Sequence, residues 1–157
     1  MSAPWHALLA PLPDEARIER KPVASTEQLE SGTAEAIRGW DSLSVNLSDP
    51  PRGLRHVLVT LDGDGRLLSA GDWVLRSRTE LRDGVAITVH DHHNIGGRFE
   101  ADGSFRGTVW ETRSEQIGDA DEATPLSSTP SAPTPEQVNA LRELTAEVIR
   151  RAPEKSR

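Results

Sequence analysis

Tight-turn motifs divide the middle of the chain into short segments. Asp-Gly pairs stand in residues 62–65, 83–84 and 102–103, and residues 94–97 form a fourth turn-like sequence. Asp-Gly supplies the positive φ angles that tight β-hairpin turns require. The segments between the turns alternate apolar and polar residues or are rich in β-branched residues, which is typical of strands. The sequence therefore predicts an antiparallel meander between residues 41 and 113.

Six short strands are expected in this meander. They cover residues 43–47, 56–61, 67–79, 85–93, 98–101 and 105–113. Successive side chains of a strand point to opposite faces of the sheet, so regularly spaced apolar residues should share a buried face. The residues expected to be buried in the sheet are Val57, Val59, Leu75, Val85, Ile87 and Val89.

The segment before the meander has different signals. Four prolines in residues 1–24 exclude a single helix there and favour an extended arm. Ser25 and Gln28 have capping-box spacing, and apolar residues recur at helical spacing as far as Trp40. We therefore expect a short helix after the arm, and we assign residues 1–117 to one sheet domain that includes both.

The clearest helix is expected at the end of the chain, in residues 135–152, after a Ser/Thr/Pro-rich linker of residues 118–134. Thr134 is the predicted N-cap, Pro135 suits the first helical position, and Gln137 completes a capping box. The helix has an apolar stripe of Val138, Leu141, Leu144, Val148 and Ile149. This stripe should dock on the sheet domain or on a partner subunit.

Together these elements predict an α+β fold, a curled antiparallel sheet of about six strands with a short N-terminal helix and a C-terminal amphipathic helix. In residues 25–113 the helical entry followed by a curled sheet resembles the cystatin-like group, which includes ketosteroid-isomerase-like and SnoaL-like proteins. The resemblance implies a cone-shaped sheet. It is architectural, because the long opening helices of that group and any tyrosine are missing here. A small calycin-like β-barrel fits the strand count nearly as well.

Composition limits the classes of partner. The 157 residues include no cysteine, which excludes disulfides, thiolate metal sites and cysteine nucleophiles. The net charge of −7 argues against nucleic-acid binding, and Arg76, Arg78 and Arg82 are interpreted as the solvated face of a strand. No stretch approaches the roughly 18 apolar residues of a membrane span, and no signal peptide is visible. A cytoplasmic protein that contacts neither nucleic acid nor membrane is expected.

The strand expected at residues 85–93 carries the side chains best suited to catalysis or metal binding. Asp91 and His93 continue its apolar face, whereas His90 and His92 lie on the opposite face. An Asp or His at the mouth of an apolar pocket can act as a general base, so Asp91 and His93 are the candidate catalytic residues.

A metal site is not expected. His90 and His92 resemble half of the cupin metal motif, but Gly96 and Gly97 stand where cupins have a glutamate. If any metal bound, His90 and His92 would be the ligands. We predict that the protein needs no cofactor.

Three functions remain open. The leading hypothesis is a domain that binds a small apolar molecule in an apolar pocket enclosed by the curled sheet. Trp73, Trp110 and His56 are the candidate ligand-binding residues, although both tryptophans also suit a core. The second is a cofactor-free isomerase, cyclase or lyase that uses Asp91 or His93 as general base. The third is an interaction module that forms homo-oligomers, such as a homodimer, through its C-terminal helix.

Overall fold

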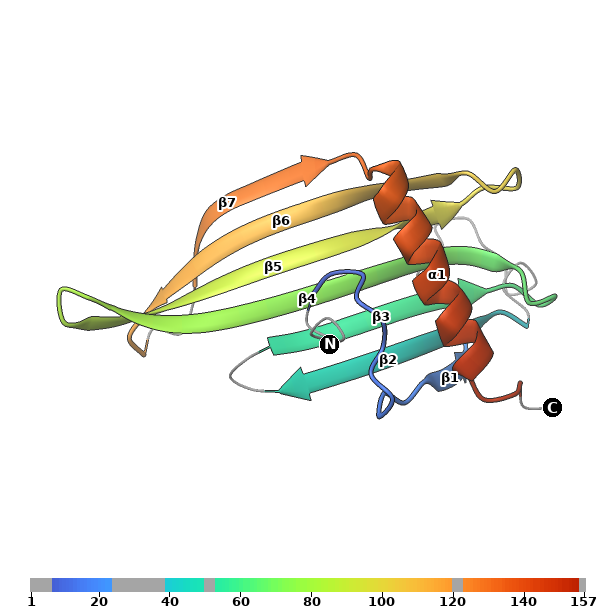
Figure 1. The fold of residues 1–157 in the computed structure, drawn as a ribbon, viewed down its shortest axis with the longest axis horizontal. Coiled ribbons are helices and arrows are strands. Elements are labelled where there is room, and N and C mark those ends of the chain that lie inside the picture. The colour runs from blue at the N-terminus through green and yellow to red at the C-terminus, as the bar shows by residue number, and fades with distance from the viewer. Residues whose placement is uncertain (1–6, 24–38, 50–52, 120–122, 156–157) are drawn as a thin grey trace.

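One open antiparallel sheet dominates the fold (Figure 1). The structure, a computed structural model, describes residues 7–23, 39–49, 53–119 and 123–155. The seven strands are β1 (Glu19–Pro22), β2 (Asp41–Asp49), β3 (Gly53–Leu61), β4 (Leu67–Arg82), β5 (Val85–Phe99), β6 (Phe105–Ile117) and β7 (Thr124–Ser131). Each strand pairs with the next one in the chain, so β1 and β7 are free edges.

This topology corrects the predicted fold class. The sheet does not close, so the calycin-like barrel is wrong, and so is a curled sheet of six strands. The helix expected between Ser25 and Trp40 falls almost entirely in residues 24–38, outside the described residues. Within the described part of the chain, the single helix is α1 (Pro135–Arg151), and strands make up most of the structure.

Glycines explain one error in the strand count. Residues 94–97 were expected to turn, but they continue β5 in register with β4 and β6. Gly97 pairs with Gly107, and a side chain at Gly97 would overlap the backbone carbonyl of Arg106. Glycines in a strand interior often mark such a close backbone approach. The Asn-Ile-Gly-Gly sequence therefore serves strand packing here, and two expected strands are one.

Two further strands lie outside the expected meander. β7 occupies the middle of the expected linker and pairs with β6, although Pro125 and Pro130 lie within it. Proline cannot donate a ladder hydrogen bond, so it is tolerated mainly in edge strands, and β7 is an edge. β1 lies within the expected arm and forms the other edge beside β2.

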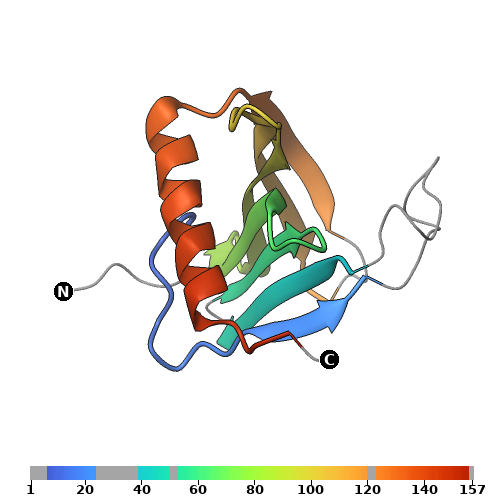
Figure 2. The same ribbon diagram turned by 90° about the vertical axis from the view of Figure 1, so that its right-hand side faces the viewer.

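The two faces of the sheet differ in what covers them. Figure 2 shows α1 crossing one face, with the segment of residues 7–18 beside it. We call this the inner face and the opposite one the outer face. The core lies between the inner face and these two segments, and its buried side chains are Leu12, Ala16, Leu43, Val45, Val57, Val59, Leu61, Ala70, Ile95, Phe99, Val109, Leu141, Leu144 and Val148.

The C-terminal helix begins where its sequence predicts. Thr134 accepts a hydrogen bond from the backbone of Gln137, and the Gln137 side chain accepts one from the backbone of Thr134. The buried side chains of α1 are Leu141, Leu144, Thr145 and Val148. The capping box is thus confirmed. The apolar stripe is confirmed in part, because Leu141, Leu144 and Val148 pack on the chain's own sheet whereas Ile149 is 38% exposed. No helix in the described ranges has the length and apolar character needed to span a membrane.

The parity prediction for the sheet is confirmed in part. Ile87 and Val89 are buried, as are Val57 and Val59. Leu75 is only half-buried because it lies on the outer face, opposite His92 of β5. Val85 is 45% exposed, because it begins β5 at the hairpin end, far from α1 (Figure 1).

A buried ion pair fastens the N-terminal segment to the inner face. The side chains of Arg55 and Asp72 are both 0% exposed. Arg55 donates from Nε to Asp72 Oδ1 at 3.0 Å and from Nη2 to Oδ2 at 2.9 Å. The backbone N–H of Leu9 donates to Asp72 Oδ2 at 2.7 Å, and Arg55 Nη2 donates to the carbonyl of Ala10 at 2.8 Å. Leu9 has a φ of 65°, which side chains disfavour, so these contacts hold a strained turn.

Candidate functional site

A polar hollow opens on the inner face, where β4, β5 and β6 run on past α1 (Figure 1). Its volume is about 290 Å³. The side chains around it are mostly charged or hydrogen-bonding. The lining residues are Arg76, Asp91, His93, Glu111, Thr112, Arg113, Ser127 and Thr129.

Two cross-strand rungs build the hollow. Arg76 of β4 pairs with Asp91 of β5, which pairs with Arg113 of β6. The next rung places His93 beside Glu111. Directly paired residues of neighbouring strands point to the same face. The period-two alternation of β5 therefore carries Asp91 and His93 to the inner face, together with the buried Ile87 and Val89.

Asp91 is held by an arginine and is a poor general base. Arg113 Nε donates to Asp91 Oδ1 at 2.7 Å. This hydrogen bond lowers the pKa of the Asp91 carboxyl below its ordinary value, and it raises the pKa of Arg113. A base with a lowered pKa accepts a proton less readily. Asp91 therefore acts as a fixed anion that orients Arg113.

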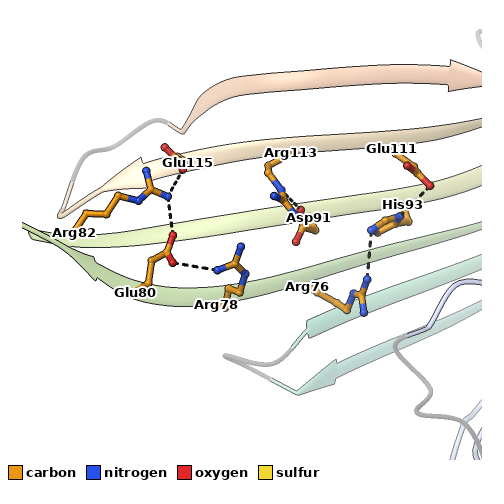
Figure 3. Close-up of polar contacts among 9 residues, drawn as sticks. All are labelled: Arg76, Arg78, Glu80, Arg82, Asp91, His93, Glu111, Arg113 and Glu115. Carbon is orange, nitrogen blue, oxygen red and sulfur yellow. Dashed lines mark hydrogen bonds and ion pairs between the residues drawn. The ribbon is translucent and has the colours of Figure 1, made fainter.

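His93 lies between two opposite charges (Figure 3). Its Nε2 is 3.4 Å from Arg76 Nη2, and its Nδ1 is 3.9 Å from Glu111 Oε1. A guanidinium can only donate, so a hydrogen bond from Arg76 requires Nε2 to accept. The other ring nitrogen, Nδ1, faces Glu111. This arrangement fixes which ring nitrogen faces each neighbour.

The arginines of this surface differ in their partners. Figure 3 shows an ionic chain in which Glu80 contacts both Arg78 and Arg82, and Arg82 also contacts Glu115. The hydrogen bond from Arg82 lowers the pKa of Glu80 and of Glu115. Arg76, in contrast, contacts no carboxylate among the described residues, and its side-chain partner is His93.

His90 and His92 lie on the outer face, away from the hollow. His90 Nδ1 is 2.7 Å from Ser77 Oγ, and its Nε2 is 3.3 Å from Gln116 Oε1. His92 lies against Trp73, with ring centroids 5.6 Å apart. The described part of the chain contains no cluster of three His, Cys, Asp or Glu side chains placed to hold a metal ion.

The three candidate ligand-binding residues also lie on the outer face. His56 pairs with Trp73, Trp73 with Asn94, and Asn94 with Trp110, so the four form one rung across β3 to β6. The sheet therefore brings His56, Trp73 and Trp110 together, but on the face opposite Asp91 and His93. The candidate residues fall into two separate surfaces.

No protein-family model, curated protein or solved structure matches this chain. Function is therefore inferred from the side chains of the hollow.

Sequence reasoning missed the two charged neighbours that β6 supplies, Glu111 and Arg113. It placed Arg76 on a solvated strand face, and the side chain is indeed exposed, but it gave Arg76 no part in a site. One signal could have found them. Charged residues recur with period two from Arg76 to Arg82 in β4, and from Glu111 to Glu115 in β6. Strands with this period present their charges on a single face. The opposite signs indicate that the charged sides of the two strands belong to the same face of one sheet.

Proposed function

We propose that this chain is a small-molecule-binding domain whose hollow holds a compact anion, a molecule that carries a carboxylate or a phosphate. The observation that carries the proposal is the set of partners that Arg76 has. This guanidinium lines the hollow and has no carboxylate partner among the described residues, whereas Arg78, Arg82 and Arg113 each have one. A guanidinium fork binds carboxylate and phosphate with two parallel hydrogen bonds.

Other groups of the hollow suit the same ligand. Ser127 and Thr129 bring hydroxyl donors from β7, on the side of the hollow opposite Arg76. Arg113 is paired with Asp91, so Arg76 is the arginine of the hollow without a carboxylate partner among the described residues, and Glu111, the second carboxylate of the lining, faces His93 instead. Ligand pockets typically have volumes of about 300–1,000 Å³, so a hollow of about 290 Å³ favours a small ligand. The polar lining favours an anion over the apolar molecule that the sequence suggested.

The proposal predicts a specific effect of Arg76. In calorimetric titrations with succinate and with inorganic phosphate, Arg76→Ala should weaken binding by about tenfold or more, because a hydrogen bond to a charged group contributes about 1.5–3 kcal/mol. Arg98→Ala is the matched control, because Arg98 is another exposed arginine of the sheet but lies on the outer face, outside the hollow. Equal weakening of anion binding by both variants would show that the effect arises from the change in net charge and not from a contact made by Arg76. Absence of binding to both anions would refute the proposal.

A further inference from the structure

The outer face carries a second surface of different chemistry. Within the described strands β2 to β6, its charged residues are Arg98 and Arg106, which pair with each other at one end. The remaining outer-face positions carry Ser, Thr, Asn, Gln, His, Trp, Leu, Ala and Gly. Charged residues make up 27% of the chain, so their exclusion from this face is a marked departure from the composition.

Aromatic and amide side chains occupy the centre of this face. We call the rung of His56, Trp73, Asn94 and Trp110 the aromatic ladder. Trp73 and Trp110 are two strands apart, which places them about 10 Å from each other at the usual strand spacing. Trp110 is 39% exposed. Neither α1 nor the segment of residues 7–18 covers the ladder, because both lie on the inner face (Figure 2).

The polar groups of the ladder distinguish between two kinds of occupant. Leu58 and Trp110 are exposed apolar side chains, but Asn94 and His56 lie among them. His56 Nδ1 is 2.7 Å from Asn46 Oδ1 within the chain, but a dry interface with a second copy would bury the Asn94 amide and the other ring nitrogen of His56, at a cost unless each found a partner. A sugar offers hydroxyl groups that both donate and accept hydrogen bonds. The C–H groups on one face of a pyranose ring can also rest on the electron-rich face of an indole.

One histidine beside the ladder has a shifted pKa. Burial, and then the neighbouring His90, lower the pKa of His92 beneath its ordinary value, which favours the neutral form of the ring that lies against Trp73. The aromatic ladder itself contains no arginine, lysine, aspartate or glutamate, and the arginines of this face, Arg98 and Arg106, lie four residues away from it along β5 and β6. A neutral ligand fits this surface best.

We propose that the aromatic ladder binds a neutral oligosaccharide in an extended conformation. Trp73 and Trp110 stack on two of its sugar rings, and Asn94, which lies between them, hydrogen-bonds the hydroxyl groups of the intervening ring. The site is separate from the anion-binding hollow, which lies on the other face.

Calorimetric titration with cellohexaose, xylohexaose and mannohexaose tests this proposal on the full chain. At least one probe should bind, and Trp110→Ala should weaken its binding by about fivefold or more, since stacking on one aromatic side chain typically contributes about 1–3 kcal/mol. Asn94→Ala should weaken binding as well. Arg76→Ala, on the inner face, should leave oligosaccharide binding unchanged. Melting temperatures within a few degrees of the parent confirm that the variants are folded.

Three results would overturn the proposal. The first is no binding of any of the three oligosaccharides. The second is binding that Trp110→Ala and Asn94→Ala leave intact. The third is a dimer in light scattering that Trp110→Ala converts to a monomer while no oligosaccharide binds, which would assign the face to a second copy of the chain.

Discussion

Replacing Asp72 with alanine should lower the free energy of unfolding by about 3–5 kcal/mol, because it removes the carboxylate that accepts two hydrogen bonds from the buried Arg55 guanidinium. Both side chains are fully buried, and Asp72 also accepts the backbone N–H of Leu9. The substitution therefore removes the anchor of the N-terminal segment together with the ion pair. Urea unfolding followed by circular dichroism measures the loss.

A second ion pair provides the control. Asp91 and Arg113 also form an aspartate–arginine ion pair, here through one contact of 2.7 Å, and their side chains are 21% and 49% exposed. Exposed pairs typically contribute up to about 1 kcal/mol, so Asp91→Ala should cost far less than Asp72→Ala. The double variant Arg55→Met with Asp72→Leu should recover part of the loss, since an apolar pair can replace a buried ionic one. Equal, small effects of Asp72→Ala and Asp91→Ala would show that burial of the first pair has no energetic consequence.

The second large effect is expected in α1. Leu141 is 0% exposed and belongs to the core between the helix and the sheet. Leu141→Ala should reduce the free energy of unfolding by about 2–5 kcal/mol, because it removes buried apolar atoms and leaves a cavity. Thermal and urea unfolding both report this change.

Ile149 of the same helix is the matched control. It is 38% exposed, and the core cluster does not include it. Substitutions at exposed positions usually change stability by no more than about 0.5 kcal/mol, so Ile149→Ala should have a small effect. If both variants unfolded like the parent protein, α1 would not be part of the core.

Local signals predicted the elements that depend on neighbouring residues. The capping box at Thr134 and the apolar stripe of α1 are both local; the capping box is confirmed, and so is the burial of Leu141, Leu144 and Val148 in the stripe. The alternation of β5 is equally local, and it places Ile87 and Val89 on the buried face as predicted. It also carries Asp91 and His93 to the same face.

Features that depend on strand pairing were not predicted. Gly96 and Gly97 resemble a turn sequence. Gly97 pairs with Gly107 of β6, and this close approach of the two backbones explains why the glycines belong to a strand. β7 has little strand propensity of its own, and its edge position permits its prolines. The sequence contains one signal for the buried Arg55 and Asp72, because both occupy the same alternate positions as the buried apolar residues of their adjacent strands. Their pairing follows from the register, which the sequence alone does not specify.

The same reason separates the candidate site residues. Parity within one strand divides Asp91 and His93 from His90 and His92, but it cannot say which side chains of other strands join each group. The register between β4, β5 and β6 adds Arg76 and Arg113 to the first pair. It also aligns Trp73 with Trp110 on the other face.

The most direct test of anion binding in the hollow is a titration of the histidine ring resonances by ¹⁵N NMR during addition of succinate. The described residues include four histidines, of which His93 alone lines the hollow. When succinate occupies Arg76, the hydrogen bond from Arg76 to His93 Nε2 should be lost, so the His93 ring nitrogens should shift saturably. The rings of the other three should stay unchanged, and Arg76→Ala should abolish the shift. Saturable shifts of His56 and His92 with a constant His93 spectrum would contradict the proposed site.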